Sequence, residues 1–217
     1  MRAAMIRHLL WETDGVLFDT HPAVTYALSQ SLNEMGYLIA LNVVDELSRQ
    51  SLEYCVDTLA ARFQLDPALL RRRSAEHYHR ILPERQPPFP GAREVCAWVA
   101  AHGGMNLIVT VRKRDSIRAL LAAHNLTRFF SDIFSLEQGY PGKSNAAILL
   151  AAMEEHALNP AETMLIGRQE SDILAGRAAG VATCLFGAAE VSSPPTLRVR
   201  DYRRLLKYLD ELSEPQT

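Results

Sequence analysis

The chain has 217 residues, with 23 Lys and Arg, 25 Asp and Glu, and 48% hydrophobic residues. A formal charge of −2 without a basic domain argues against a nucleic-acid binder, and no apolar run reaches the about 18 residues that a membrane span needs. Arg7 and His8 interrupt the only apolar stretch near the start, which is unlike a signal peptide. We therefore expect a cytoplasmic protein that forms one large domain, or a core with a modest insertion.

The three cysteines, Cys55, Cys96 and Cys184, are widely spaced and form no Cys-x-x-Cys pair. This spacing predicts neither a disulfide framework nor a zinc site, and favours buried thiols in a reducing compartment. His77 and His79 stand two residues apart in a helical stretch, so they point to different helix faces and do not suggest a metal site.

The first predicted element is a buried strand, because a short apolar run at 6–11 leads into an Asp-Gly turn. Residues 21–85 carry apolar side chains at helical spacing and predict a block of roughly four helices. The proline-rich segment 86–91 follows and is typical of a hinge. Beyond it we predict helices at 92–101, 115–124, 144–156, 172–179 and 202–212, and strands at 105–110, 133–136, 163–167 and 181–186.

This alternation of helices with apolar strands is typical of a parallel sheet that is covered by helices on both faces. The fold class predicted is therefore α/β, with a helical insert after the first strand. We place the α/β core at residues 1–19 and 87–217 and the insert at 20–86.

Reactive or charged side chains follow the predicted strands at the points where ligands bind in open parallel sheets. Glu12 and Asp14 follow the first strand, and Thr110 ends the second. Lys143 comes after the third strand, and Arg168 to Asp172 follow the fourth. We expect these groups to lie together at one edge of the sheet.

These residues stand in motifs that resemble those of the haloacid dehalogenase-like (HAD) superfamily. Residues 10–19, with the sequence LWETDGVLFD, are similar to its first motif, DxDGTL or DxDGVL. Thr110 and Lys143 match the second and third motifs, and residues 167–180, GRQESDILAGRAAG, are similar to the fourth, GDxxxDxxAGxxAG. The helical insert is similar to the cap of the phosphoglycolate phosphatase and β-phosphoglucomutase branch.

The resemblance implies a three-layer HAD-like core, an α-helical cap and a role for each matched residue. The residue at position 12 would attack phosphorus, and Asp14 would act as general acid and base. Thr110 and Lys143 would bind the phosphate, with Lys143 also balancing charge in catalysis. Asp172 would be a carboxylate near Mg²⁺.

Two positions depart from the family pattern, because Glu12 replaces the nucleophilic Asp and Arg168 replaces a carboxylate that normally binds the metal. Arg has no acceptor atom and cannot bind a cation. We hypothesise that the Arg168 guanidinium takes the place of Mg²⁺ and pairs with Glu12. On this interpretation no cofactor is bound, and Mg²⁺ is expected only if the protein is active.

Alternatives remain open on the sequence. Glu12 is still nucleophilic in one of them, with Glu170 as a substitute metal ligand. In another, Arg168 points into solvent and Lys143 with Thr110 binds anions without a metal. Runs of basic residues at 71–73 and 112–114 are interpreted as solvated helix faces, and Arg49 is a weak candidate for a substrate contact.

The function favoured by the site is binding of a phosphorylated small molecule, or of a partner that the sequence does not identify, with impaired or absent Mg²⁺-dependent hydrolysis. The alternative is an active phosphatase of small phosphomonoesters such as phosphoglycolate or sugar phosphates. Residues 139–144 end in Gly-Lys-Ser but lack the first glycine of a P-loop, so that motif is discarded.

Overall fold

The computed structural model describes residues 5–140 and 145–213, which form two compact units. The core unit comprises residues 1–18 and 88–217, and the second unit comprises residues 19–87. Lys143 therefore lies outside the described residues. None of the helices in the described ranges has the length and apolar character that would let it cross a membrane.

The core unit is built on one six-stranded parallel sheet with the strand order β3-β2-β1-β4-β5-β6. Parallel pairing sets Leu10 of β1 opposite Leu107 of β2 on one side and Leu165 of β4 on the other. The strands are β1 His8–Trp11, β2 Asn106–Thr110, β3 Phe130–Ser135, β4 Thr163–Gly167, β5 Ala182–Phe186 and β6 Leu197–Val199. The α/β fold class predicted from the sequence is confirmed.

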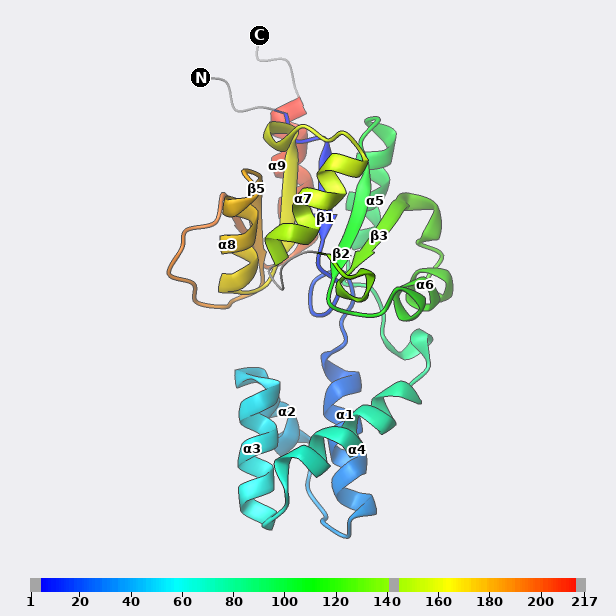
Figure 1. Ribbon diagram of the computed structural model, residues 1–217, viewed down its shortest axis with the longest axis vertical. Helices are drawn as coiled ribbons and strands as arrows, with labels where there is room; N and C mark the ends of the chain where they lie inside the picture. Colours follow the sequence, from blue (N-terminus) through cyan, green and yellow to red (C-terminus); the bar gives the residue numbers. More distant parts are fainter. Residues whose placement is uncertain (1–4, 141–144, 214–217) are drawn as a thin grey trace. The chain divides into compact units, whose positions relative to one another are not determined.

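Helices cover both faces of this sheet, as Figure 1 shows for α7 and α8 in front of the strands and α9 behind them. The core helices are α5 Ala92–Ala101, α6 Arg114–Ala123, α7 Asn145–Glu155, α8 Glu170–Ala178 and α9 Tyr202–Ser213. Side chains alternate along each strand, so Leu9 and Trp11 join the layer under α5, α6 and α9 while Leu10 joins the layer under α7 and α8. Burial on both faces explains why the strands are continuous apolar runs.

Polar contacts inside the first layer fix the register of the central strands. The buried Trp11 indole N–H donates to Asn106 Oδ1 at 2.9 Å. The Asn106 side-chain amide also donates from Nδ2 to the carbonyl of Cys96 at 3.0 Å and to that of Phe129 at 3.1 Å. A buried amide with all these partners ties β1, β2, α5 and the start of β3 together.

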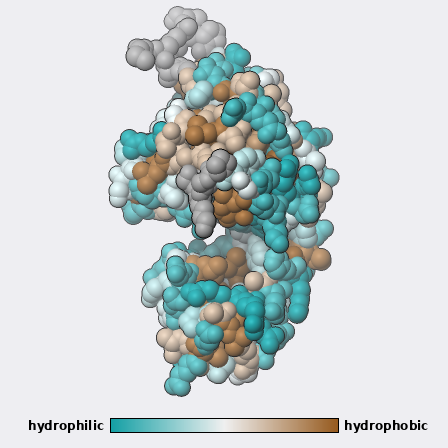
Figure 2. All heavy atoms as spheres, in the orientation of Figure 1, coloured by the Kyte–Doolittle hydropathy of each residue, from teal (hydrophilic) through white to brown (hydrophobic). Residues whose placement is uncertain are grey.

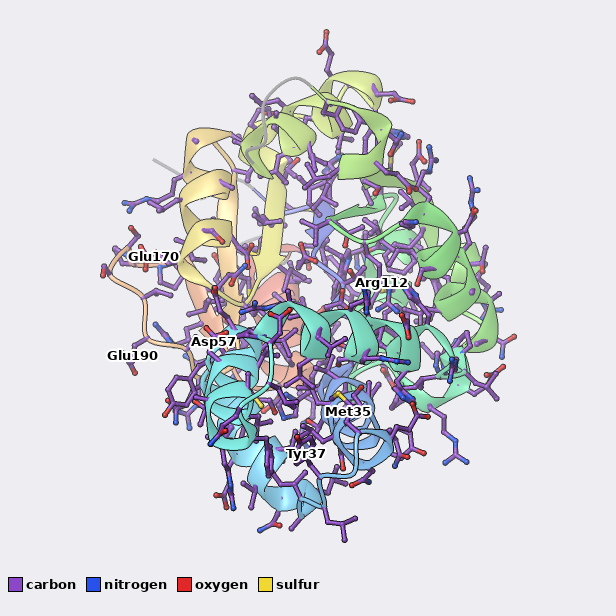
Figure 3. The ribbon with its side chains drawn as sticks, turned by 60° about the horizontal axis from the view of Figure 1, so that its bottom comes forward. Met35, Tyr37, Asp57, Arg112, Glu170 and Glu190 are labelled. Carbon is purple, nitrogen blue, oxygen red and sulfur yellow. The ribbon has the colours of Figure 1, made fainter. Side chains whose placement is uncertain are left out.

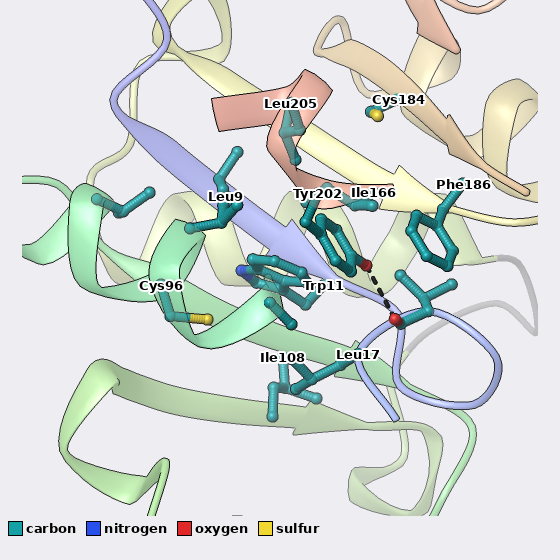
Figure 4. Packing of buried hydrophobic residues seen from close by; sticks show 14 of the residues in the cluster. Leu9, Trp11, Leu17, Cys96, Ile108, Ile166, Cys184, Phe186, Tyr202 and Leu205 are labelled. Atoms are coloured by element: carbon teal, nitrogen blue, oxygen red, sulfur yellow. Dashed lines mark hydrogen bonds between the residues drawn. The ribbon is translucent and has the colours of Figure 1, made fainter. Parts of the chain in front are cut away.

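Tyr202 anchors the loop that follows β1, as the close view in Figure 4 shows. Its hydroxyl donates to the carbonyl of Val16 at 2.8 Å, and its ring stacks on Phe186 with the centroids 4.5 Å apart. The residue is fully buried, so this hydrogen bond has no competition from water. A residue of α9 therefore fixes the loop that carries the candidate site residues.

We expect Tyr202→Phe to lower the free energy of unfolding by about 1 to 3 kcal/mol, because the Val16 carbonyl loses its buried donor while the ring packing remains. Urea unfolding followed by tryptophan fluorescence measures this, since Trp11 and Trp98 both belong to the core unit. Tyr208→Phe is the matched control on the same helix, because Tyr208 is half-buried and its hydroxyl has no hydrogen-bond partner among the described residues. An equal loss in both variants would contradict this role of Tyr202.

The second unit consists of helices around its own apolar cluster, which includes Leu28, Val56, Leu59 and Leu70. Its helices are α1 His21–Glu34, α2 Leu41–Gln50, α3 Leu52–Phe63 and α4 Pro67–His79, followed by a short 3-10 turn at Pro83–Arg85. Ser51 and Asp66 accept backbone N–H groups at the starts of α3 and α4, which explains where these helices begin. Hydrophobic residues on the face in Figure 2 show as separate areas among hydrophilic ones in both units.

Candidate active site

The carboxyl ends of the neighbouring strands β1, β2 and β4 bring the predicted site residues together. Glu12 follows β1 directly and keeps the pairing with β4 through its N–H, which donates to the Ile166 carbonyl at 3.0 Å. Thr110 is the last residue of β2, and its hydroxyl donates to Glu12 Oε1 at 3.3 Å. This edge is also where the strand order reverses between β1 and β4, the usual ligand position in open α/β sheets.

Thr13 is a further member of this group that the sequence analysis did not single out. Its backbone N–H donates to Glu12 Oε1 at 3.0 Å, and its side-chain oxygen lies 2.7 Å from that of Thr110. Both threonines are buried, with exposed fractions of 0% and 2%. The first motif leaves the residue between its two acids unspecified, so only the alternation of side chains beyond β1 could have indicated it.

Glu12 lies in an environment that disfavours its charge. Burial raises the pKa of Glu12 to about 7, the Thr13 N–H opposes that rise, and the nearby charges of Asp172 and Asp14 add to it. Glu12, Thr110 and Asp172 line a cavity of about 10 Å³ together with apolar side chains of β2, β4 and α7, which is room for one water. At neutral pH this carboxyl is therefore about half protonated.

Asp14 is held in an ion pair with Arg112, whose Nη1 lies 2.7 Å from Asp14 Oδ1. The Arg112 side chain is only 12% exposed, and its Nε donates to Ser116 Oγ at 2.8 Å. Its backbone N–H also donates to the Thr110 hydroxyl at 3.2 Å. The prediction that 112–114 form a solvated helix face is therefore wrong for Arg112, which is labelled in Figure 3.

The other basic residues are placed as follows. Arg114 is also partly buried and pairs with Asp132 across 3.0 Å. The run at 71–73 is exposed, with Arg71 paired to Asp57 at 2.6 Å. Arg49 is exposed in the last turn of α2, where its Nε lies 2.8 Å from Asp45 Oδ2.

Asp172 is buried, with an exposed fraction of 3%, and it closes the turn between β4 and α8. Its Oδ2 accepts the backbone N–H groups of Arg168 at 2.8 Å and of Gln169 at 3.1 Å. Burial raises the pKa of Asp172, while these N–H groups and the Arg168 charge oppose the rise. Gly167 is required here, because a Cβ atom at that position would stand 2.3 Å from the Asp172 Cβ.

Arg168 does not form the expected ion pair with Glu12. Among the described residues neither side chain takes part in any salt bridge. The exposed Arg168 side chain instead extends along the loop after β1, so that a Cβ on Gly15 would stand 2.8 Å from its Nη1. The hypothesis of Glu12–Arg168 pairing is therefore wrong: the longer Glu12 side chain turns to Thr13 and Thr110, and the guanidinium lies over Gly15.

Glu170 is engaged elsewhere in the core unit. Its carboxylate accepts the backbone N–H groups of Ser192 at 2.5 Å and Ser193 at 2.9 Å. A hydrogen bond from the Ser193 side chain lowers the pKa of Glu170, and these backbone N–H groups add to that effect. Figure 3 shows Glu170 near the loop that carries Glu190 and well apart from Arg112. The structure therefore does not place Glu170 as a substitute ligand beside Glu12.

Comparison with known proteins gives the family of this site. A sequence model of the haloacid dehalogenase-like hydrolases matches residues 9–186. The chain belongs to the haloacid dehalogenase-like hydrolase family. The resemblance to this superfamily seen in the sequence motifs is thereby confirmed.

Relatives of this HAD protein include a phosphoglycolate phosphatase of Aliivibrio fischeri, 24% identical over 187 residues that cover 81% of each chain. One of Pseudomonas syringae pv. tomato is 25% identical over 91% of this chain and 78% of its own. A HAD-superfamily hydrolase of Geobacter sulfurreducens shares the fold with a TM-score of 0.74 at 18% identity, with 96% of this chain and 98% of that chain covered. A HAD family hydrolase of Deinococcus radiodurans, solved with bound phosphate and sodium, has a TM-score of 0.72 at 17% identity, with coverage of 96% and 97%.

The donor set of this HAD protein does not fit the Mg²⁺ that the family implies for an active member. Mg²⁺ needs oxygen donors in octahedral arrangement. Asp14 is paired with Arg112, Asp172 Oδ2 already accepts two N–H groups, and Arg168 offers no acceptor. In the parts of the chain that the structure describes, no three His, Cys, Asp or Glu side chains are grouped to hold a metal ion.

Proposed function

We propose that this HAD protein binds a phosphorylated small molecule at the carboxyl ends of β1, β2 and β4 and does not hydrolyse it in a Mg²⁺-dependent reaction. The observation that carries the proposal is Arg168, an exposed cation at the position where the family motif has a metal-binding carboxylate. A guanidinium cannot bind Mg²⁺ and repels it. The same positive charge attracts anions such as a phosphate group.

The chemistry of the two carboxyl groups supports the loss of hydrolysis. A nucleophile must be ionised, and burial raises the pKa of Glu12 to about 7, so only about half of it is ionised at neutral pH, which by itself lowers the rate of attack about twofold. Its Oε1 also accepts hydrogen bonds from Thr13 and Thr110. Asp14 would have to exchange protons with a leaving group, but its Oδ1 is engaged by Arg112 Nη1 at 2.7 Å.

The phosphorylated ligand is supported by the relatives of the chain. The curated relatives are named phosphoglycolate phosphatases, and the Deinococcus radiodurans hydrolase of the same fold was solved with bound phosphate. We propose that residues 19–87 serve as the cap of the family and that Lys143 joins Thr110 in binding the phosphate. A cytoplasmic location is also proposed, since all three cysteines are free and buried.

Phosphate release tests this proposal. The purified protein is incubated with p-nitrophenyl phosphate, phosphoglycolate and a set of sugar phosphates, once with Mg²⁺ and once with EDTA. We expect no release above background in either condition, from a sample whose circular dichroism shows a folded protein. Turnover with Mg²⁺ that EDTA abolishes would overturn the proposal and establish the alternative, an active phosphatase.

A further inference from the structure

The charged groups at the strand ends are nearly balanced without any metal ion. Glu12, Asp14 and Asp172 supply three carboxyl groups, and Arg112 and Arg168 supply two guanidinium groups. Because burial raises the pKa of Glu12 to about 7, this carboxyl is only partly ionised at neutral pH, and the two guanidinium groups offset most of the carboxylate charge. A site that needed Mg²⁺ to admit a phosphate would instead carry an excess of carboxylates.

The two guanidinium groups are arranged differently. Arg112 is nearly buried, and its Nη1 neutralises Asp14 at 2.7 Å. An approaching anion therefore does not meet an uncompensated Asp14 charge. Arg112 acts through Asp14 in this arrangement and is a positioning residue.

Arg168 is the cation that a ligand can reach, because its side chain is exposed and forms no salt bridge within the described residues. Two contacts fix its place. Its backbone N–H is bound to Asp172 Oδ2 at 2.8 Å, and its side chain extends beside Gly15, in the loop that carries Asp14. Gly15 has φ +73°, and a Cβ there would also lie 2.9 Å from Arg168 Cδ, so the glycine leaves the space in which the arginine lies.

We propose that Arg168 binds a tetrahedral dianion, the phosphate of the ligand, and does so without a divalent cation. A guanidinium presents paired N–H groups that match two oxygens of a phosphate, which gives both affinity and orientation. The inference rests on the proposed phosphorylated ligand, and it adds the residue that binds the phosphate and the independence from metal.

Isothermal titration calorimetry of the full chain with inorganic phosphate, in EDTA and in Mg²⁺, tests this inference. We expect the two dissociation constants to agree within about twofold. Arg168→Gln is expected to weaken binding about tenfold or more, as for the loss of a charge-assisted hydrogen bond. Arg168→Lys keeps the charge but not the paired N–H groups, so its dissociation constant is expected to lie between those of the unsubstituted protein and Arg168→Gln.

Arg177→Gln is the matched control, because Arg177 is an exposed arginine on α8, the helix that follows the turn carrying Arg168. This variant is expected to bind phosphate with the affinity of the unsubstituted protein. Phosphoglycolate is expected to displace phosphate from the variant and from the unsubstituted protein. Binding that requires Mg²⁺, unchanged binding in Arg168→Gln, or failure of phosphoglycolate to compete would overturn the inference. Turnover of esters by a protein that still binds phosphate in EDTA through Arg168 would instead overturn only the proposed function.

Discussion

The double variant Glu12→Asp/Arg168→Asp is expected to release phosphate from p-nitrophenyl phosphate in a Mg²⁺-dependent way, at least about 100-fold faster than the unsubstituted protein. Shortening the side chain at position 12 moves its carboxylate by about 1 Å, a displacement that can decide whether an attack is productive. An aspartate at position 168 replaces a cation by two acceptor oxygens beside Asp172, which turns a repelling position into a ligand for Mg²⁺.

The two single variants show whether both changes are needed. Each is expected to stay near background, because one lacks the metal-binding carboxylate and the other keeps the longer acid, so the gain should be strongly non-additive. Arg168 is exposed, and its replacement should leave folding intact. A folded double variant that is as inactive as the starting protein would show that positions 12 and 168 alone do not account for the lost reaction.

The fold was predictable because its strands are buried on both faces. The strand β4, Thr163–Gly167, and the helix α5, Ala92–Ala101, both have the bounds that the sequence predicts. The strand β6, Leu197–Val199, was missed, because three residues beyond a Ser-Pro segment are too few to show a periodic pattern. The strand β3 begins at Phe130, three residues before the predicted start, since Ser131 and Asp132 interrupt its apolar character.

The site was predictable in its membership but not in its pairing. Strand ends placed Glu12, Thr110 and Asp172 at one edge, as expected from the parallel topology. Which cation meets which carboxylate depends on side-chain directions beyond each strand, and these are set by tertiary packing. Arg112, two residues before α6 begins, turns inward to Asp14, while the Arg168 side chain lies along Gly15 and its backbone N–H is bound to Asp172. A run of basic residues gives no sign of such a difference.

The charge state of Glu12 gives the second large prediction, a loss of stability as the pH rises. The pKa of Glu12 is about 7 in the folded protein against 4.5 for the free side chain, so the folded state binds more protons than the unfolded state between these values. The contribution of Glu12 to stability is therefore complete below about pH 4.5 and disappears as the pH rises through 7. For a shift of this size the loss is at most about 3 kcal/mol.

Glu12→Gln should remove most of this pH dependence, because an amide oxygen can still accept the N–H of Thr13 and the hydroxyl of Thr110 but carries no charge. We expect urea unfolding, followed by tryptophan fluorescence at pH 5 and pH 8, to show a smaller loss of stability in this variant by about 1 to 3 kcal/mol. Glu154→Gln, at an exposed position of α7, is the control, and its free energy of unfolding should depend on pH as that of the unsubstituted protein does. The raised pKa of Asp172 acts in the same direction in all three proteins, and the part of its effect that comes from its own burial is common to them. An identical pH dependence in Glu12→Gln would mean that Glu12 is ionised in the folded protein at neutral pH, and the argument against its role as a nucleophile would lose its electrostatic part.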